Sequence, residues 1–600
     1  MAQSTSSAET RTEKLARWAA NLQYHDLPEE VIQRTKELFI DWLGCTIAGR
    51  HHPAVAAIVR FATQMGPSSG KSELIDGSLG LTSSPAFASL INGASSHVVE
   101  QDDLHNRSIM HPATVIFPAA LAVAQDIHAD GKEFITACVV GYEVGCRTGG
   151  YLGKSHYEKF HSTATGGVVG VAAAVARLLH LDVNQTLSAI GTAGTQAAGL
   201  WQFLLDATHS KQVHTGKACF DGIFAAYSAR DGLLGPRDIL EGSRGMGAAL
   251  VPGETSPEAI GQGLGLDYAV LGSSFKWHAS CRHTHPSVDA LLALMAKHQV
   301  KFHEIDSVVA RTYQAAINVL GLTGRGETVH QSKFSMGFVL AVAAKNGQAM
   351  ITDFTEEVLE DAELREFQQR VTMELDPEID ARFPKQWQGT IVVVCKDGRQ
   401  YTESVEYLKG DPENPLTRDT ESTQHFALER GTIALRSDAA VSASGLSDKP
   451  RGTTHELPLD YPVYYFFYGT LSVAANLKRI IDLQEPRLRE AKIIGYALAK
   501  WGDYPALING QQGQEVSGYV YLVQCKEKAQ KLAYYETNTY LVADCWVFFT
   551  DDEEPSEAPG RTFTYAGDAQ ALLERFHRKL WTLQMGGKLG FCTKCIERSQ

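Results

Sequence analysis

One stretch late in the chain is too polar to join a hydrophobic core, so the residues on its two sides are expected to fold separately. Residues Ser437–Leu459 are rich in Ser, Asp, Pro and Gly and poor in apolar side chains, which is the composition of a linker. The chain of 600 residues also exceeds the roughly 250–300 residues at which single cores stop growing. We therefore expect a multidomain protein, with a linker over 437–460 and a separate domain over 461–590.

The first part of the chain has the pattern of successive helices. Leu27–Leu43, Ser84–Val99 and Gly166–Leu181 carry Ala, Leu and Val at helical spacing, with Gly or Pro at the breaks. The small residues of Thr163–Ala174 indicate helices that pack closely around a centre. This pattern predicts an all-α helical domain over residues 10–272.

The pattern changes after about Ser273. Ser307–Tyr313 and Thr390–Cys395 alternate or run in β-branched residues, and Lys396–Gly398 supplies a hairpin turn into Gln400–Val405. These strands predict a smaller α+β domain over 273–408, after which 409–436 returns to the helical domain.

Three apolar runs beyond the linker predict strands. They are Val463–Phe467, Val516–Val523 and Cys545–Phe549. The last domain is therefore expected to be mainly β, with an α+β barrel-like fold.

Charge and targeting signals narrow the class of protein. The formal net charge of −14 argues against nucleic-acid and membrane surfaces, because both bind basic faces. No apolar run approaches the ~18 residues of a membrane helix, and the first fifteen residues have no signal core. We expect a cytoplasmic protein with reduced cysteines, and an anionic substrate would need a local basic island.

The segment Ser96–Pro112 gathers unusual chemistry. It holds three carboxylates and three histidines, namely Glu100, Asp102, Asp103, His97, His105 and His111. A solvated loop is the plain interpretation, but the apolar helix Ala113–Ala124 that follows would let loop side chains point into a cleft. We expect no metal site here, because no ligand pair has a familiar zinc spacing.

Three further segments place His, Lys or Arg just before helices rich in small residues. They are Lys159–Thr163, Thr208–Lys217 and Phe275–His285. Any one of them alone is more typical of a structural or surface position than of a site.

Together with Phe39–Gly44, Asn92–Ala94 and Lys333–Ser335, these motifs resemble the MmgE/PrpD family from about Leu15 to Thr432. Known members include 2-methylcitrate dehydratase, cis-aconitate decarboxylase and iminodisuccinate epimerase. The resemblance implies a large helical domain with a smaller lid domain and a pocket between them. It also implies a homodimer through the helical domain and no metal or organic cofactor.

The reactions of this family remove a proton next to a carboxylate of a small carboxylic acid. The resulting dianion needs fixed positive groups in a closed site, and a group near neutral pKa must carry the proton. The resemblance implies that His111 and His161 form an acid/base pair and that Lys211 anchors a carboxylate. The further substrate contacts that we expect are Glu100, Asp103, His214, Cys281, Arg282, His285 and Lys333.

Four positions depart from the family's usual residues. The family often has Asp at Glu100, Thr at Leu104 and Tyr at Phe338, and cis-aconitate decarboxylase has His at Cys281. Leu104 and Phe338 lack a hydroxyl, so the decarboxylase's hydrogen bonds there cannot form. We therefore expect first a dehydratase of a small di- or tricarboxylate, next an isomerase or epimerase, and third a decarboxylase.

A second resemblance covers about Val463 to Trp581. The strand Tyr464–Leu471 ends in a Gly turn whose N–H groups can hold a carboxylate. With Tyr504–Ala506, Val516–Tyr521 and Leu532–Tyr540, it resembles the γ-glutamylcyclotransferase-like family, in which the substrate amine attacks its own γ-carbonyl. The resemblance implies that a γ-glutamyl amine binds here, with Glu536 as the proton shuttle and the grip supplied by Tyr468, Gly469, Thr470 and Leu471.

Two alternatives stay open. In the first alternative, only one of the two domains is catalytic. In the second, both domains have kept their folds but lost their activities, and the chain is a non-catalytic binding protein.

Overall fold

The computed structural model divides into two compact units, Met1–Ser447 and Asp448–Gln600, and each is described by itself. The described residues are 9–67, 69–75, 81–206, 208–321, 326–416, 462–481, 486–494, 496–501, 504–509, 514–525, 528–529, 531–532, 540–551 and 553–565. The predicted linker over 437–460 lies outside these residues, as does most of the predicted return over 409–436. No helix within the described part of the chain is long and apolar enough to cross a membrane.

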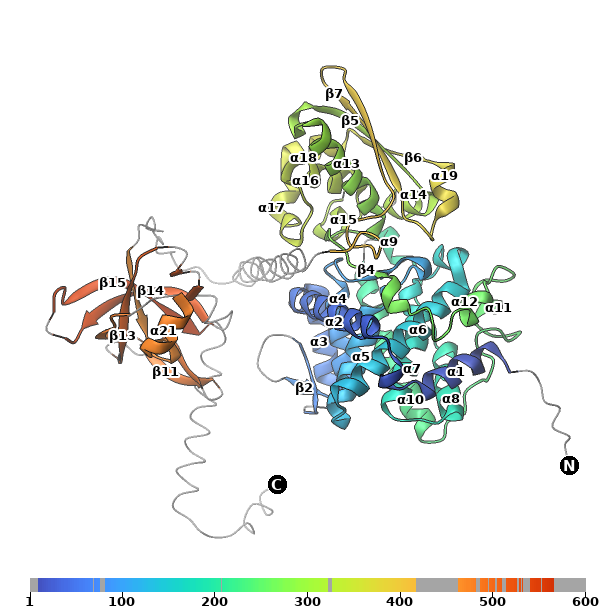
Figure 1. Ribbon diagram of the computed structural model, residues 1–600, viewed down its shortest axis with the longest axis horizontal. Coiled ribbons are helices and arrows are strands. Elements are labelled where there is room, and N and C mark those ends of the chain that lie inside the picture. Colours follow the sequence, from blue (N-terminus) through green and yellow to red (C-terminus); the bar gives the residue numbers. More distant parts are fainter. Residues whose placement is uncertain are drawn as a thin grey trace, which may run out of the picture. The chain divides into compact units, whose positions relative to one another are not determined.

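The first half of unit one is helical, as the sequence predicts (Figure 1). Three of its helices begin at capping boxes, at Thr10, Asp130 and Asp182, whose side chains satisfy free backbone N–H groups. The helices are α1 (Arg11–Asn21), α2 (Glu29–Gly49), α3 (Pro53–Met65), α4 (Pro85–His97), α5 (Ala113–Ile127), α6 (Gly131–Tyr157), α7 (Ser162–Leu178), α8 (Val183–Thr195), α9 (Phe203–Asp206), α10 (Ser210–Arg230), α11 (Met246–Leu250) and α12 (Glu258–Gly261).

Helix α7 forms the centre of this helical layer, and every one of its residues is buried. It packs against α5, α6, α8 and α10. The contact with α6 is close because it is made by glycines: a Cβ on Gly170 would lie 2.6 Å from the carbonyl oxygen of Gly141. The small-residue run therefore allows backbones to approach where larger side chains would separate them.

The second half of unit one is built on a four-stranded sheet in the order β6-β5-β7-β8. Strands β5 (Ile305–Thr312) and β6 (Val371–Leu375) are parallel, whereas β7 (Gly389–Cys395) is antiparallel to both β5 and β8 (Gln400–Val405). Helix α13 (His285–His298) packs against β7 and β8. Smaller helices complete this region, namely α14 (Gln314–Leu320), α15 (Val329–Ser332), α16 (Met336–Asn346), α17 (Glu356–Leu359), α18 (Ala362–Gln368) and α19 (Pro377–Arg382).

Unit two contains a closed five-stranded barrel in the order β10-β13-β9-β15-β14, which agrees with the predicted barrel-like fold. The strands are β9 (Val463–Phe467), β10 (Arg489–Ile494), β13 (Glu515–Val523), β14 (Tyr540–Phe549) and β15 (Glu557–Tyr565). Only the β9–β15 pair is parallel. Its described residues also form a separate hairpin of β11 (Tyr496–Trp501) and β12 (Tyr504–Asn509) and the helix α21 (Ala474–Ile481).

Strand β9 carries an unbroken run of apolar, mostly aromatic residues, because both of its faces are buried. Tyr465 and Phe467 enter one apolar cluster, and Phe466 enters another, because successive side chains of a strand point to opposite sides. An uninterrupted apolar run is therefore what this position requires.

Candidate active site

The first part of the loop between α4 and α5, residues 98–104, is buried, which excludes the plain interpretation of a solvated loop there. His97, Glu100, Asp102 and Asp103 are each at most 1% exposed. Glu100 adopts left-handed backbone geometry, with φ at 60°, which is uncommon for a residue with a long side chain. Such strain persists only where surrounding contacts hold it, and it is concentrated at functional sites.

Buried lysines surround the Glu100 carboxylate. The Nζ of Lys211, in the first turn of α10, contacts Glu100 Oε1, and the Nζ of Lys276 lies 3.8 Å from Glu100 Oε2. Burial alone would raise the pKa of Glu100, but the two ammonium groups lower it to about 2. A third lysine, Lys333, donates to the carbonyl of Val99 at 2.9 Å.

Burial acts in the opposite direction on the lysines themselves. It lowers the pKa of Lys276, and it lowers the pKa of Lys333 to about 8. These three side chains form the local basic island that an anionic substrate requires in an acidic chain.

Asp102 anchors two histidines through a single oxygen. Its Oδ2 lies 2.9 Å from His97 Nδ1 and 2.8 Å from His111 Nδ1. Because His111 Nδ1 also lies 2.7 Å from the carbonyl oxygen of Asp103, this nitrogen carries the proton and Nε2 is left as a base. Burial raises the pKa of Asp102, but His97 and His111 hold it well below its usual range.

His97 itself is neutral near pH 7. Burial, and next the charge of Lys211, lower its pKa to about 4. His97, Asp102 and His111 also present three potential metal ligands within 4.8 Å of one another, which the sequence spacing did not predict. In the structure Asp102 contacts both rings through their Nδ1 atoms.

His161 lies at the start of α7 and connects this cluster to a pocket. Its ring stacks on His97 at 5.3 Å, and its Nδ1 lies 3.3 Å from His214 Nδ1. Burial, then His97 and His214, hold the pKa of His161 well below its usual range. Among the described residues, none offers His161 Nε2 a hydrogen bond.

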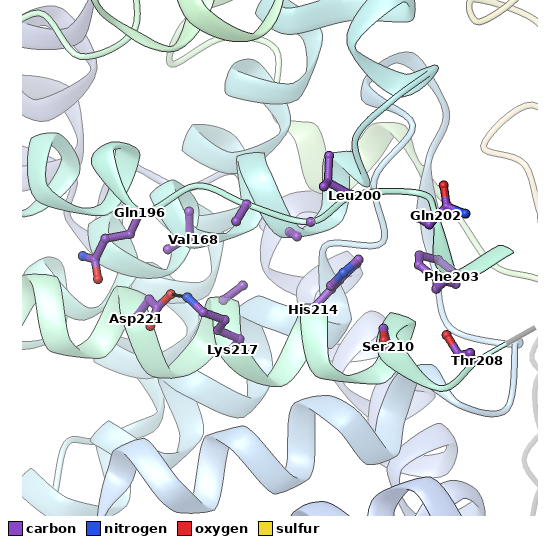
Figure 2. A pocket seen from close by; sticks show the side chains of 14 residues that line it. Val168, Gln196, Leu200, Gln202, Phe203, Thr208, Ser210, His214, Lys217 and Asp221 are labelled. Carbon is purple, nitrogen blue, oxygen red and sulfur yellow. Dashed lines mark hydrogen bonds and ion pairs between the residues drawn. The ribbon is translucent and has the colours of Figure 1, made fainter. Parts of the chain in front are cut away.

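His214 lines a pocket of about 440 Å³, and Figure 2 shows its side chain rising from α10 toward the segment that carries Leu200. Burial, followed by Lys211, lowers the pKa of His214 to about 4. The pocket therefore reaches His161 through a neutral imidazole.

Asp103 contacts protein groups. Its Oδ1 accepts a hydrogen bond from the Ala113 N–H at 3.0 Å, and its Oδ2 accepts one from the Tyr142 hydroxyl at 3.0 Å. Burial raises the pKa of Asp103 to about 8. In this arrangement it supports the start of α5.

Three predicted residues lie at the start of α13. Burial raises the pKa of the Cys281 thiol to about 11. Arg282 Nη2 contacts Asp411 Oδ1, and His285 Nε2 lies 3.3 Å from the carbonyl oxygen of Ser280. Protein acceptors thus already engage the two residues that were expected to hold an anion.

Lys276 was absent from the predicted site, although it lies in the basic segment Phe275–His285. Asp102 and His97 were noticed as part of a charged run, but their anchoring role was missed. Leu104 and Phe338, which have no hydroxyl group, are both buried: Leu104 is 1% exposed, and the Phe338 ring lies 5.1 Å from the guanidinium of Arg365.

The remaining predicted site residues belong to unit two. The Tyr468 hydroxyl donates to the carbonyl of Phe563 at 2.6 Å, and the Ser472 hydroxyl donates to that of Gly469 at 2.6 Å. Thr470 begins a short 3₁₀ helix, and Leu471 is 1% exposed in the apolar core. Glu536 lies outside the described residues.

Three family models match the chain. The MmgE/PrpD N-terminal domain matches residues 13–258, the MmgE/PrpD C-terminal domain matches 278–421, and the γ-glutamyl cyclotransferase, AIG2-like domain matches 465–583.

Similar proteins carry related names. The cis-aconitate decarboxylase-like protein oryM of Aspergillus oryzae is 28% identical over 469 residues, which cover 72% of this chain and 95% of that protein. A cis-aconitate decarboxylase of Aspergillus terreus is 27% identical, covering 66% of this chain and 84% of that protein. The Homo sapiens cis-aconitate decarboxylase is 26% identical, covering 68% and 85%. Both resemblances found in the sequence are thus confirmed, and the chain belongs to the MmgE/PrpD family and carries a C-terminal γ-glutamyl cyclotransferase, AIG2-like domain.

Proposed function

We propose that unit one is a cofactor-independent lyase that moves a proton at a carbon next to a carboxylate of a small di- or tricarboxylate. The observation that carries this proposal is the burial of Lys211, Lys276 and Lys333 beside histidines that are neutral near pH 7. Fixed cations in a dry site stabilise the charge that develops when the proton leaves. Neutral imidazoles can accept that proton.

Each group has a distinct role in this proposal. Lys211 and Lys276 bind one substrate carboxylate, which competes with Glu100 for their charge. His111 acts through Nε2 as the base, because Asp102 and the Asp103 carbonyl fix the proton on Nδ1. The proton that His111 takes is given back to carbon in decarboxylation or leaves with the hydroxyl group as water in dehydration, and His161 is the second member of this acid/base pair.

The bond that breaks decides between two reactions. We take dehydration as the first, because Leu104 and Phe338 present no hydroxyl where the family's decarboxylases have one. Decarboxylation is the second candidate, and it is favoured by the names of the relatives.

Proton NMR in D2O tests the proposal. The protein is incubated with citrate, 2-methylcitrate, cis-aconitate, itaconate and malate, with Lys211→Met as the inactive control. A new alkene signal with loss of a hydroxy acid means dehydration, whereas itaconate formed from cis-aconitate means decarboxylation. If no acid exchanges deuterium or changes its spectrum, the proposal is wrong.

For unit two we propose a γ-glutamylcyclotransferase that uses Glu536 and releases 5-oxoproline from a γ-glutamyl amine. The match to the γ-glutamyl cyclotransferase, AIG2-like model supports it. Release of 5-oxoproline by the full chain, and its loss in Glu536→Gln, is the expected result. The homodimer and the cytoplasmic location stay predictions.

A further inference from the structure

His161 is joined to His214 by a hydrogen bond between two imidazoles. Their Nδ1 atoms are 3.3 Å apart. Because burial lowers the pKa of both rings, they are neutral near pH 7, and only one of the two Nδ1 atoms carries a proton. The donor ring then has a bare Nε2, whereas the acceptor ring holds its proton on Nε2. The pair therefore has two arrangements, which differ only in where the protons lie.

The two rings face different surroundings. His161 is 1% exposed, and its ring stacks on that of His97 at 5.3 Å. His214 is half-buried and lines the pocket of about 440 Å³, together with the hydroxyl-bearing side chains of Thr208 and Ser210 (Figure 2). A cavity of this size with polar groups in its wall can hold water. The His214 ring thus lies between a space open to solvent and the buried histidines.

The chain between α8 and α10 holds both rings in place. The His161 N–H donates to the carbonyl of Gly199 at 2.8 Å, and a Cβ on Gly199 would lie 3.3 Å from His214 Nδ1. The ring of Trp201 lies 5.0 Å from that of His161. The ring of Phe203 lies 5.4 Å from that of His214. The contact between the two imidazoles is therefore fixed by packing against both rings.

This contact can resupply protons to the proposed reaction. His161 is one member of the acid/base pair, so each proton that it gives to a substrate must be replaced before the next turnover. A proton taken up at His214 Nε2 allows the Nδ1 proton of that ring to move to His161 Nδ1, while His161 releases its own proton from Nε2. One proton enters for each proton delivered, and both rings end neutral. The reverse sequence removes a proton from the site and restores the starting arrangement.

We propose that His214 is a proton relay, which exchanges protons between solvent in the pocket that it lines and His161. This inference rests on the proposed function, because it requires His161 to give and take protons. It gives His214 a role in place of the substrate contact expected from the sequence. In this role His214 acts through His161 and touches no substrate.

Two substitutions at His214 separate proton transfer from hydrogen bonding. His214→Ala removes the ring and opens its space to the pocket, whereas His214→Gln keeps a group that can bond to His161 Nδ1 but cannot carry a proton. With an acid that the wild-type full chain turns over, kcat should fall about 10- to 100-fold in both variants, while KM changes by less than about threefold. Added imidazole should raise kcat of His214→Ala roughly tenfold, because the free base fills the vacated space, and should leave the wild type unchanged.

His156→Ala is the matched control. His156 is fully buried, and its ring stacks on that of Phe160 at 5.1 Å. Burial lowers its pKa to about 4, the same value as for His214. This variant should unfold at a lower temperature, because it leaves a cavity, but its kcat should stay near the wild-type value. It should not respond to imidazole, since no proton passes through this ring.

The outcomes separate the relay from the proposed function. If the wild type turns over none of the acids, the proposed function is wrong and the inference falls with it. If the wild type is active but His214→Ala keeps its kcat, or loses it without rescue by imidazole, His214 is not a relay. If His214→Gln is as fast as the wild type, His214 only orients His161. An equal imidazole response in His156→Ala would show that the rescue is unspecific, and this too would refute the relay.

Discussion

The two units treat charge in opposite ways. Unit one encloses Lys211, Lys276 and Glu100, with side chains at most 3% exposed. In the described part of unit two, ion pairs such as Arg489–Asp551 lie at the surface, with side chains 12% and 27% exposed. Its buried clusters are apolar and aromatic.

The two units therefore differ in whether they bury charged groups. Desolvating a charge is costly, and replacing buried ion pairs by apolar groups often stabilises a protein. Unit one therefore gives up stability to keep a charged site preformed, whereas the barrel strands form an apolar scaffold. Substitutions in the two units test whether they differ in this way.

The largest effect is expected from Lys211→Met. It removes a substrate anchor and leaves Glu100 with less compensation, so kcat/KM of unit one should fall about 10³-fold or more. Lys297→Met is the control, because its ammonium group is 60% exposed on α13 and pairs with Glu403 Oε2 at 2.7 Å. Steady-state assays should show near-normal activity for it, and 5-oxoproline release should be unchanged in both variants. Equal losses in both lysine variants would contradict the assignment.

Gly170→Ala tests the close backbone packing of unit one. The new Cβ would meet the Gly141 carbonyl oxygen at 2.6 Å, so unfolding free energy should fall by about 1–3 kcal/mol. On α6, a Cβ at Gly150 would meet only the Ala259 Cβ at 3.5 Å. Gly150→Ala should therefore be neutral or stabilising by about 0.5–1 kcal/mol in urea unfolding. A neutral Gly170→Ala would mean that α6 and α7 can separate at little cost.

The raised pKa of Asp103 leads us to expect that the stability of unit one responds to pH in the opposite direction from that of unit two. Burial raises its pKa from 3.8 to about 8, so the folded state binds a proton that the unfolded state releases, and stability falls as pH rises between these values. Asp103→Asn mimics the protonated acid and should flatten this decline, raising the melting temperature at pH 8 by about 2–4 °C.

Unit two should not share that decline. Arg489 lowers the pKa of Asp551, so its contribution is present above the ordinary carboxyl range and is lost only in acid. Calorimetric scans of the full chain at pH 5 and pH 8 resolve the two units by their transitions. An unchanged pH response in Asp103→Asn would refute the raised pKa.

The smallest effect is expected at the barrel surface. Arg489 contacts both oxygens of Asp551, at 2.8 and 2.6 Å, and its guanidinium lies 3.8 Å from the centre of the Phe549 ring. Arg489→Met should reduce the stability of unit two by about 1 kcal/mol. Arg487, whose side chain is 75% exposed, should tolerate Met within about 0.5 kcal/mol in the same denaturant series. A loss of several kcal/mol at Arg489 would show that the barrel too depends on charge.

Local patterns predicted much of the fold. The apolar run Val463–Phe467 is β9 residue for residue, and the hairpin turn at Lys396–Gly398 joins β7 to β8. The pattern in Gly166–Leu181 predicted α7, but its start at Ser162 was missed because His161 fills the capping position without a capping side-chain bond. The β11–β12 hairpin was also missed, since its Ala and Pro residues weaken the strand pattern.

The site was only half predictable. The run from His97 to His111 is visible because its charges are adjacent in sequence. Lys276 was missed because its approach to Glu100 depends on how the chain before α13 packs against the α4–α5 loop, and no spacing encodes that distance.

The complete burial of α7 has a consequence for how this protein can be altered. A helix with no exposed side chain has no position at which a larger residue can turn outward, so its surroundings restrict every site from Ser162 to Leu178. Changes that reshape the pocket beside His214 are therefore better made in the segment 196–203 and on α10 than at the two α7 residues, Ala164 and Val168, that also line it. Directed libraries aimed at new substrates would be best placed there, with α7 left untouched as the fixed reference that holds His161.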